Sequence, residues 1–185
     1  MNPARFQDAI TRIDAANAAD PRGIDLPYAQ RLSAWVDRLA PEASEPLRLA
    51  ARAQHLCRWM IPRDSFPAGR VSYLQWREHL KQIHAQKAGE ILRAVGYDDA
   101  LVSRVQHLIG KRNFPRDEEG RVLEDALCLV FLETQFVETI AKTGDEKMIG
   151  ILQKTWRKMT PPAQQIALGL AMTPAQHALI TRAIQ

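Results

Sequence analysis

Apolar residues recur along almost the whole chain at the three- and four-residue spacing that is typical of amphipathic helices. No alternating stretch bounded by turn residues is long enough to predict a strand. Prolines, glycines and capping residues divide the pattern, so we expect helices that end before residues 20 and 41, and helices over about 45–59, 72–95, 99–109, 120–142, 146–158, 161–170 and 174–184. The sequence therefore predicts an all-α fold, a helical bundle of about eight or nine helices.

The length of 185 residues suits one domain that buries its own core. We expect a single domain over 1–185, in which the C-terminal helices of about 145–185 pack on the rest of the bundle. Because no apolar run approaches the roughly 20 residues of a membrane span, we expect no membrane association. The first residues lack the apolar core of a signal peptide, which favours a cytoplasmic protein.

Cysteine content and charge narrow the chemistry only slightly. Cys57 and Cys128 both have apolar neighbours, which predicts reduced core thiols and gives no disulfide framework or zinc ribbon. The formal net charge of +4 permits an anionic ligand such as a nucleotide, but it is too small by itself to indicate a nucleic-acid-binding protein. Walker, dinucleotide-binding and nucleophile-elbow motifs are absent from the sequence.

Polar residues interrupt apolar stretches of predicted helix at three places: His55, His84 and the pair Glu124–Asp125. Burying ionisable groups without partners is costly, so we expect a shared metal site or a hydrogen-bonded cluster. Two histidines and one carboxylate can bind iron, manganese or zinc and leave coordination positions open. We therefore take His55, His84 and Asp125 as candidate ligands of a divalent metal, and add Glu124 as a candidate catalytic residue. In the alternative, each group only has a structural hydrogen-bond partner.

Basic residues that could bind a phosphate group lie in three parts of the sequence. Arginine offers a planar, permanently charged set of donors that matches phosphate. The candidate substrate-binding residues are Arg52, Arg58, Arg63, Lys111, Arg112, Lys154 and Arg157. For each group taken alone, the pattern favours a solvated surface, and cations also favour helix C-termini. Tryptophans beside these arginines are either core residues or platforms on which a base could stack.

The order of three segments, AARAQHL, HAQKAGEILRAVGYDDALVSRVQHLI and LEDALCLVFLE, resembles the layout of HD-domain phosphohydrolases. This resemblance implies an HD-like helical core in which histidines and a later aspartate converge on metal. The first ligand histidine of that layout would fall near Tyr28–Ala29, and no aspartate adjoins His55. The resemblance therefore implies either a single metal held by His55, His84 and Asp125, or a pocket that has lost its metal.

Over nearly its whole length, the chain is also similar to an uncharacterised family described only as a domain of unknown function. The segments that carry this similarity are FQDAITRIDAANAADP, YAQRLSAWVDRLAP, RAQHLCRW, YLQWREHLKQIHAQKAGEIL, LEDALCLVFLE and LQKTWRKMTP. This similarity brings no established activity with it.

These observations lead to one leading hypothesis and three alternatives. The leading one is an HD-like, metal-dependent phosphohydrolase that acts on a nucleotide or another phosphoester, in which Arg58, Arg63 and Lys111 neutralise the substrate's charge. A variant uses an iron site for oxygen-dependent chemistry. A second class is a non-catalytic module that binds a nucleotide or RNA through the same basic residues. The third is a structural or partner-binding bundle, and the sequence leaves the oligomeric state open.

Overall fold

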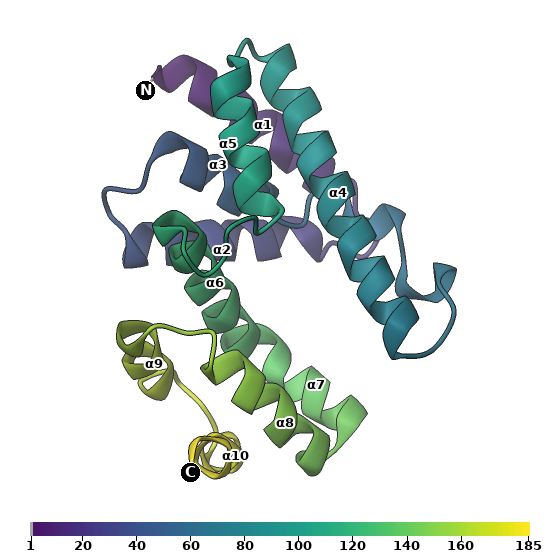
Figure 1. The fold of residues 1–185 in the computed structure, drawn as a ribbon, viewed down its shortest axis with the longest axis vertical. Coiled ribbons are helices and arrows are strands. Elements are labelled where there is room, and N and C mark those ends of the chain that lie inside the picture. The colour runs from purple at the N-terminus through teal and green to yellow at the C-terminus, as the bar shows by residue number, and fades with distance from the viewer. Residues whose placement is uncertain (1) are drawn as a thin grey trace. The chain divides into compact units, whose positions relative to one another are not determined.

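The structure is a computed structural model that describes residues 2–185, and all of its regular elements are helical (Figure 1). This confirms the predicted all-α fold. The chain divides into two compact units, 1–120 and 121–185. An HD-like core, a single domain over 1–185 and the packing of its C-terminal helices stay predictions. Within the described part of the chain, no helix has both the length and the apolar character needed to cross a membrane.

The first unit is built on five helices, α1 (Pro3–Ala18), α2 (Asp25–Leu39), α3 (Glu45–Ala53), α4 (Arg70–Ala94) and α5 (Asp99–Ile109). The short helix α3 packs against α1, α2 and α5, and the long helix α4 lies beside α5 (Figure 1). Helix α3 contributes Leu47, Leu49 and three fully buried alanines to the core. Small side chains let the neighbouring helices approach closely, while each buried leucine stabilises the fold by about 1.5–3 kcal/mol.

The connection between α4 and α5 follows the local signals in the sequence. Gly96 has a φ of +86°, a left-handed conformation that glycine adopts without steric cost. The side chain of Asp98 then accepts a hydrogen bond from the backbone N–H of Leu101 and caps α5. This helix end and this cap were both predicted from the sequence.

The third helix is shorter than predicted. We expected it to continue to about residue 59, but α3 ends at Ala53 and is followed by turns and a 3-10 segment over Arg58–Met60. Cys57 has a φ of +58°, which no right-handed helix accommodates. His55 therefore lies in the turn after α3, and a second 3-10 segment, Arg63–Ser65, leads into α4.

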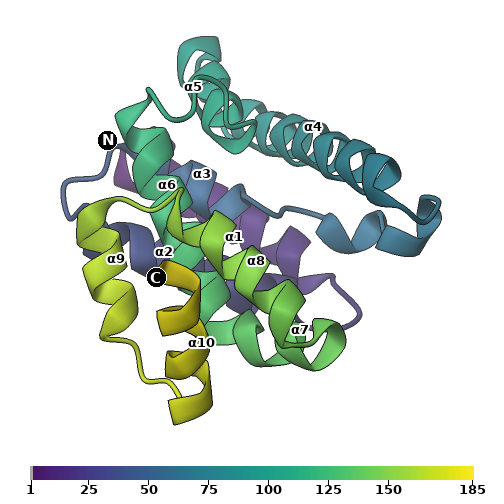
Figure 2. The ribbon, with the colours of Figure 1, turned by 60° about the horizontal axis from the view of Figure 1, so that its bottom comes forward.

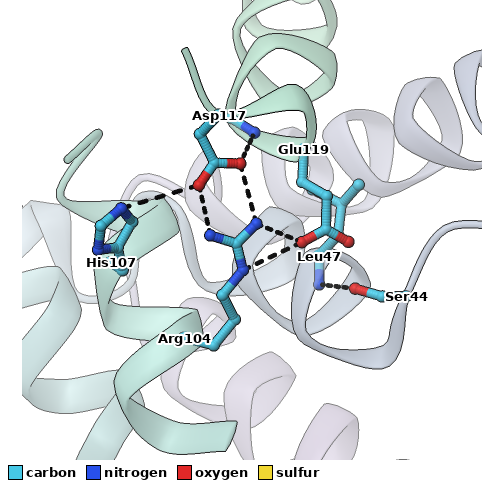
Figure 3. Close-up of polar contacts among 7 residues, drawn as sticks. Ser44, Leu47, Arg104, His107, Asp117 and Glu119 are labelled. Atoms are coloured by element: carbon cyan, nitrogen blue, oxygen red, sulfur yellow. Dashed lines mark hydrogen bonds and ion pairs between the residues drawn. The ribbon is translucent and has the colours of Figure 1, made fainter. Parts of the chain in front are cut away.

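A network around Arg104 fixes the loop after α5 (Figure 3). Arg104 donates hydrogen bonds to both carboxylate oxygens of Asp117 and to Glu119, and the His107 Nε2 lies 3.7 Å from Asp117. The backbone N–H of Gly120 also donates to Asp117, at 3.0 Å. These contacts, led by Arg104, lower the pKa of Asp117 to about 2. The network ties α5 to the start of α6.

The second unit contains most of α6 (Glu118–Val130), a π-helical segment over Phe131–Gln135, and four further helices: α7 (Phe136–Thr143), α8 (Asp145–Trp156), α9 (Pro161–Leu168) and α10 (Pro174–Ile184). The sequence predicted one continuous helix over 120–142, and the π-helical turn interrupts it. Helix α8 packs against α7 and α10 (Figure 2). The side chains of Thr160 and Thr173 cap α9 and α10, each directly before a proline, as predicted.

Candidate functional site

The first unit contains a pocket of about 310 Å³ whose polar and aromatic walls come from three parts of the chain. The loop between α1 and α2 contributes one wall, the turns after α3 a second and helix α4 a third. The lining residues that carry chemistry are Asp20, Arg22, Arg58, Trp59, Arg63 and Trp76. Three guanidinium groups therefore face one carboxylate, so the lining of the pocket carries an excess of positive charge.

Arg58 differs from the other two lining arginines, because Arg22 pairs with Asp20 and Arg63 donates to backbone carbonyls. Its guanidinium lies over the ring of Trp76, 4.8 Å from the ring centre. Burial lowers the pKa of Arg58, although the negative charge of Asp25 nearby acts in the opposite direction. No hydrogen bond or ion pair of this guanidinium is formed within residues 2–185. The donors of Arg58 are therefore available to an anion in the pocket.

The guanidinium of Arg63, another lining residue, is fixed by hydrogen bonds to the backbone. Arg63 donates one hydrogen bond to the carbonyl oxygen of Phe66 and one to that of Pro67, both at 2.9 Å. Its guanidinium also lies 5.9 Å from the ring centre of Trp76, whose indole N–H donates to the carbonyl of Ile61 at 3.0 Å. The loop before α4 therefore fixes both the cation and the aromatic wall before any ligand binds.

The acidic residue of the pocket is already engaged. Asp20 accepts hydrogen bonds from the backbone N–H groups of Arg22, Ile24 and Asp25, and from the side chain of Arg22. Burial alone raises the pKa of Asp20, but these hydrogen bonds outweigh it and the pKa is lowered overall. Asp20 is thus a structural cap for the start of α2, and its charge is partly neutralised by Arg22.

Two histidines that do not line the pocket lie next to one another, and the charge of the lining residue Arg58 acts on both. His84, on α4, is only 2% exposed, and its Nδ1 lies 2.6 Å from the carbonyl oxygen of Leu56. A carbonyl oxygen can only accept, so Nδ1 carries the proton and donates it. Burial lowers the pKa of His84 to about 4, which keeps the ring neutral at pH 7. The Nε2 atom of His84 is then unprotonated and carries a free lone pair. This atom is buried and has no hydrogen-bond partner in the described structure.

The second histidine, His55, is partly exposed and lies beside His84. Its ring stacks on Tyr28, with ring centres 4.5 Å apart, and lies 5.8 Å from the ring of His84. Burial lowers the pKa of His55 well below its usual range, and the charge of Arg58 lowers it further. Tyr28 is one of the two residues near which the HD layout would place its first histidine. The structure thus brings Tyr28, His55 and His84 together, with Arg58 close enough to influence both histidines.

The two acidic candidates belong to the second unit and have partners there. Asp125 accepts hydrogen bonds from the backbone N–H of Thr160 at 2.8 Å and from its hydroxyl at 2.6 Å. Burial raises the pKa of Asp125, and the hydrogen bonds from Thr160 oppose that increase. Glu124 forms an ion pair with Lys158 at 3.1 Å. Over residues 2–185, no three histidine, cysteine, aspartate or glutamate side chains form a group that could hold a metal. A metal role for His55, His84 and Asp125 stays a prediction.

The other five basic candidates do not line the pocket. Arg52 forms a two-pronged ion pair with Asp14, at 2.6 and 2.8 Å, and so joins α3 to α1. Lys111 contributes positive charge that lowers the pKa of His55. Arg112, Lys154 and Arg157 are exposed, and none of the five candidates in this paragraph lines the pocket. Only Arg58 and Arg63 of the predicted substrate-binding residues do so.

Sequence reasoning missed the contribution of the loop between α1 and α2. Arg22 follows Asp20–Pro21, a combination that marks a turn and carries no periodic signal. Tyr28 was considered only as the place of an absent histidine, yet its ring stacks on His55. The one local signal for this part of the pocket was a short polar loop in which an arginine directly follows Asp–Pro.

Comparisons with known proteins give one positive result. No curated protein and no solved structure matches the chain. The family described as Domain of unknown function (DUF4202) matches residues 7–180, which is nearly the whole sequence. The chain therefore belongs to this family.

Proposed function

We propose that the first unit binds a phosphate-bearing ligand, a nucleotide or another phosphoester, in the pocket lined by Arg58, Arg63 and Trp76. The observation that carries this proposal is the Arg58 guanidinium, which stacks on Trp76 and has no hydrogen bond or ion pair in the described chain. A half-buried cation loses hydration, and an anion with several acceptor oxygens restores both charge balance and hydrogen bonds.

The aromatic walls favour a nucleotide among phosphoesters. The pocket volume of about 310 Å³ lies at the lower end of the range for small-molecule sites. Trp59 and Trp76 offer apolar surface for a planar ring, and the buried indole N–H of Trp59 has no acceptor among residues 2–185. A phosphate group on the guanidiniums and a base against the indoles would satisfy these groups together.

Calorimetric titration of AMP into the wild-type protein and into Arg58→Ala tests this function. Removing a charge-assisted contact to phosphate should weaken binding about 10-fold or more. Arg38→Ala is the matched control, because Arg38 also lies 4.8 Å above a tryptophan ring, that of Trp35, but outside the pocket. Equal affinity of the wild type and Arg58→Ala, or no binding by the wild type, would contradict the proposal.

A second candidate function is hydrolysis of the bound phosphoester with a divalent metal held by His55 and His84. His84 supports it, because its Nδ1–H donates to a backbone carbonyl while its Nε2 stays bare, which is the usual arrangement of a metal-binding histidine. Iron, manganese or zinc there would supply Lewis-acid activation of water. Both oxygens of Asp125 accept hydrogen bonds from Thr160 within the second unit, so this candidate function is proposed with the two histidines alone.

Elemental analysis of purified protein tests the second candidate. Wild-type protein reloaded with iron, manganese or zinc should retain close to one equivalent after desalting, and His84→Ala should retain none. His177→Ala is the control, because His177 is exposed and belongs to the second unit. Retention of the same amount of metal by the His84 variant would contradict a site at this residue.

A further inference from the structure

We infer, as an extension of the phosphate binding proposed above, that the ligand of this pocket is the end of a single-stranded nucleic acid. The pocket does not stop at Trp76. From there, a row of alternating cationic and aromatic side chains continues along the first turns of α4 towards solvent. We call this row the stacking ladder, and its members are Arg58, Trp76, Arg63, Tyr73 and Arg77.

Each neighbour in the stacking ladder lies within cation–π distance of the next. The Arg58 guanidinium is 4.8 Å from the ring centre of Trp76, and that of Arg63 is 5.9 Å from the ring centres of both Trp76 and Tyr73. Arg77 lies 5.9 Å from the Tyr73 ring and donates a hydrogen bond to its hydroxyl at 3.4 Å. The rings of Tyr73 and Trp76 are 5.8 Å apart. The five side chains form one continuous surface.

From Trp76 outwards, the exposure of the side chains in the stacking ladder rises. Trp76 is 6% exposed, whereas Tyr73 is 41% exposed and Arg77 is also at the surface. Residues 73, 76 and 77 are three and four positions apart on α4, so they share one side of the helix. An exposed tyrosine that is oriented by two arginines keeps surface available for a second planar group.

This arrangement suits a chain of nucleotides better than a mononucleotide. Bases stack on aromatic rings and on guanidinium planes, and phosphates pair with the same guanidiniums, which is how single strands are recognised without a duplex. The pocket alone would accommodate one nucleotide and would not use Tyr73 or Arg77. Of the acids around this surface, Glu78 is paired with Lys81 at 2.8 Å and Asp20 with Arg22 at 3.3 Å. The charges of Asp25, which acts on Arg58, and of the exposed Asp64 oppose a polyanion.

Fluorescence anisotropy with labelled hexanucleotides, in competition with unlabelled AMP at constant salt, tests the stacking ladder. The wild type should bind both RNA and DNA hexamers at least about 10-fold more tightly than AMP. Tyr73→Ala should weaken hexamer binding about 5- to 100-fold, as expected for the loss of one base-stacking platform. Tyr73→Phe should restore hexamer affinity, because stacking needs the ring and not the hydroxyl. Tyr73→Ala should keep the AMP affinity of the wild type, because the pocket does not use Tyr73, and this result shows that the variant folds.

The outcomes separate this inference from the proposed pocket. If AMP binds in an Arg58-dependent manner but hexamers bind no more tightly than AMP, the ladder is overturned and the pocket stands. If Arg58→Ala changes neither ligand, the proposed function fails. Inorganic polyphosphate of equal charge that binds as tightly as the hexamer would show that charge alone accounts for binding, and would overturn recognition by stacking.

Discussion

The two units of the chain treat their buried polar groups differently. Every buried side-chain nitrogen or oxygen that has no hydrogen-bond partner among residues 2–185 belongs to the first unit, and these atoms include the Nε2 of His84 and the indole nitrogen of Trp59. In the second unit, the two buried acids have partners, since Asp125 binds Thr160 and Glu124 binds Lys158. Burial of a polar residue is therefore a weak sign of a site, and burial without a partner is a stronger one.

The largest effect that we expect from this difference is a pH-dependent loss of stability due to His84, in the first unit. Its pKa is about 4 in the folded protein, against 6.5 as the ordinary value. The folded state therefore resists protonation, so stability is complete above pH 6.5 and falls as the pH drops towards 4, by about 3 kcal/mol. Urea unfolding of chelator-treated protein at several pH values measures this loss.

The control for this pH dependence is the variant His84→Gln, in which the loss between pH 6.5 and 4 should shrink to the remainder due to His55 and the carboxylates. His177→Gln is the matched histidine variant, since His177 is exposed and belongs to the second unit. If the His84 variant and the wild type lost stability in parallel, His84 would not be the buried neutral ring described above.

A smaller effect is expected from the satisfied acid of the second unit. Asp125→Ala removes two hydrogen bonds that join α6 to the cap of α9, and should lower the free energy of unfolding by about 2 kcal/mol. Thermal and urea unfolding measure it. Lys154→Ala, at an exposed position of the same unit, provides a comparison variant. Unchanged stability of Asp125→Ala would mean that Asp125 is kept for a reason other than this junction.

The smallest effect of the three concerns Asp117, a well-partnered acid of the first unit. Arg104 and the backbone of Gly120 lower its pKa to about 2, below the ordinary value of 3.8. Its contribution is complete above pH 3.8 and is lost as the pH falls through 2. Because the Arg104 side chain is one-third exposed, we expect about 1 kcal/mol. Asp117→Asn should flatten the stability profile between pH 5 and 2, and an unchanged slope would contradict the ion pair shown in Figure 3.

Much of the fold could be predicted because its signals are local. The periodic apolar residues, Gly96 and the caps Asp98, Thr160 and Thr173 each act on their own neighbours, and they place the helices correctly. The end of α3 could not be predicted. It depends on a left-handed backbone conformation at Cys57, a residue type that gives no sign of it.

Only those residues of the candidate site could be predicted that are recognisable from their immediate sequence neighbours. His55 and His84 attracted attention as polar residues on apolar faces, and they do lie together. The partner of Asp125 is Thr160, 35 residues later, and no local pattern indicates that pairing. The pocket joins a loop, a turn and a helix, so Arg22 and Trp76 become neighbours only through tertiary packing.

The most direct test of ligand binding at Arg58 is an NMR titration that follows the guanidinium Nε–H signals of the arginines as AMP is added. We predict that the Arg58 signal shifts and becomes protected from solvent exchange at saturation, while the signal of Arg38, which also stacks on a tryptophan, stays in place. An Arg58 signal that does not move while AMP is bound would contradict the account, because the cation without a partner would then not be the group that receives the phosphate.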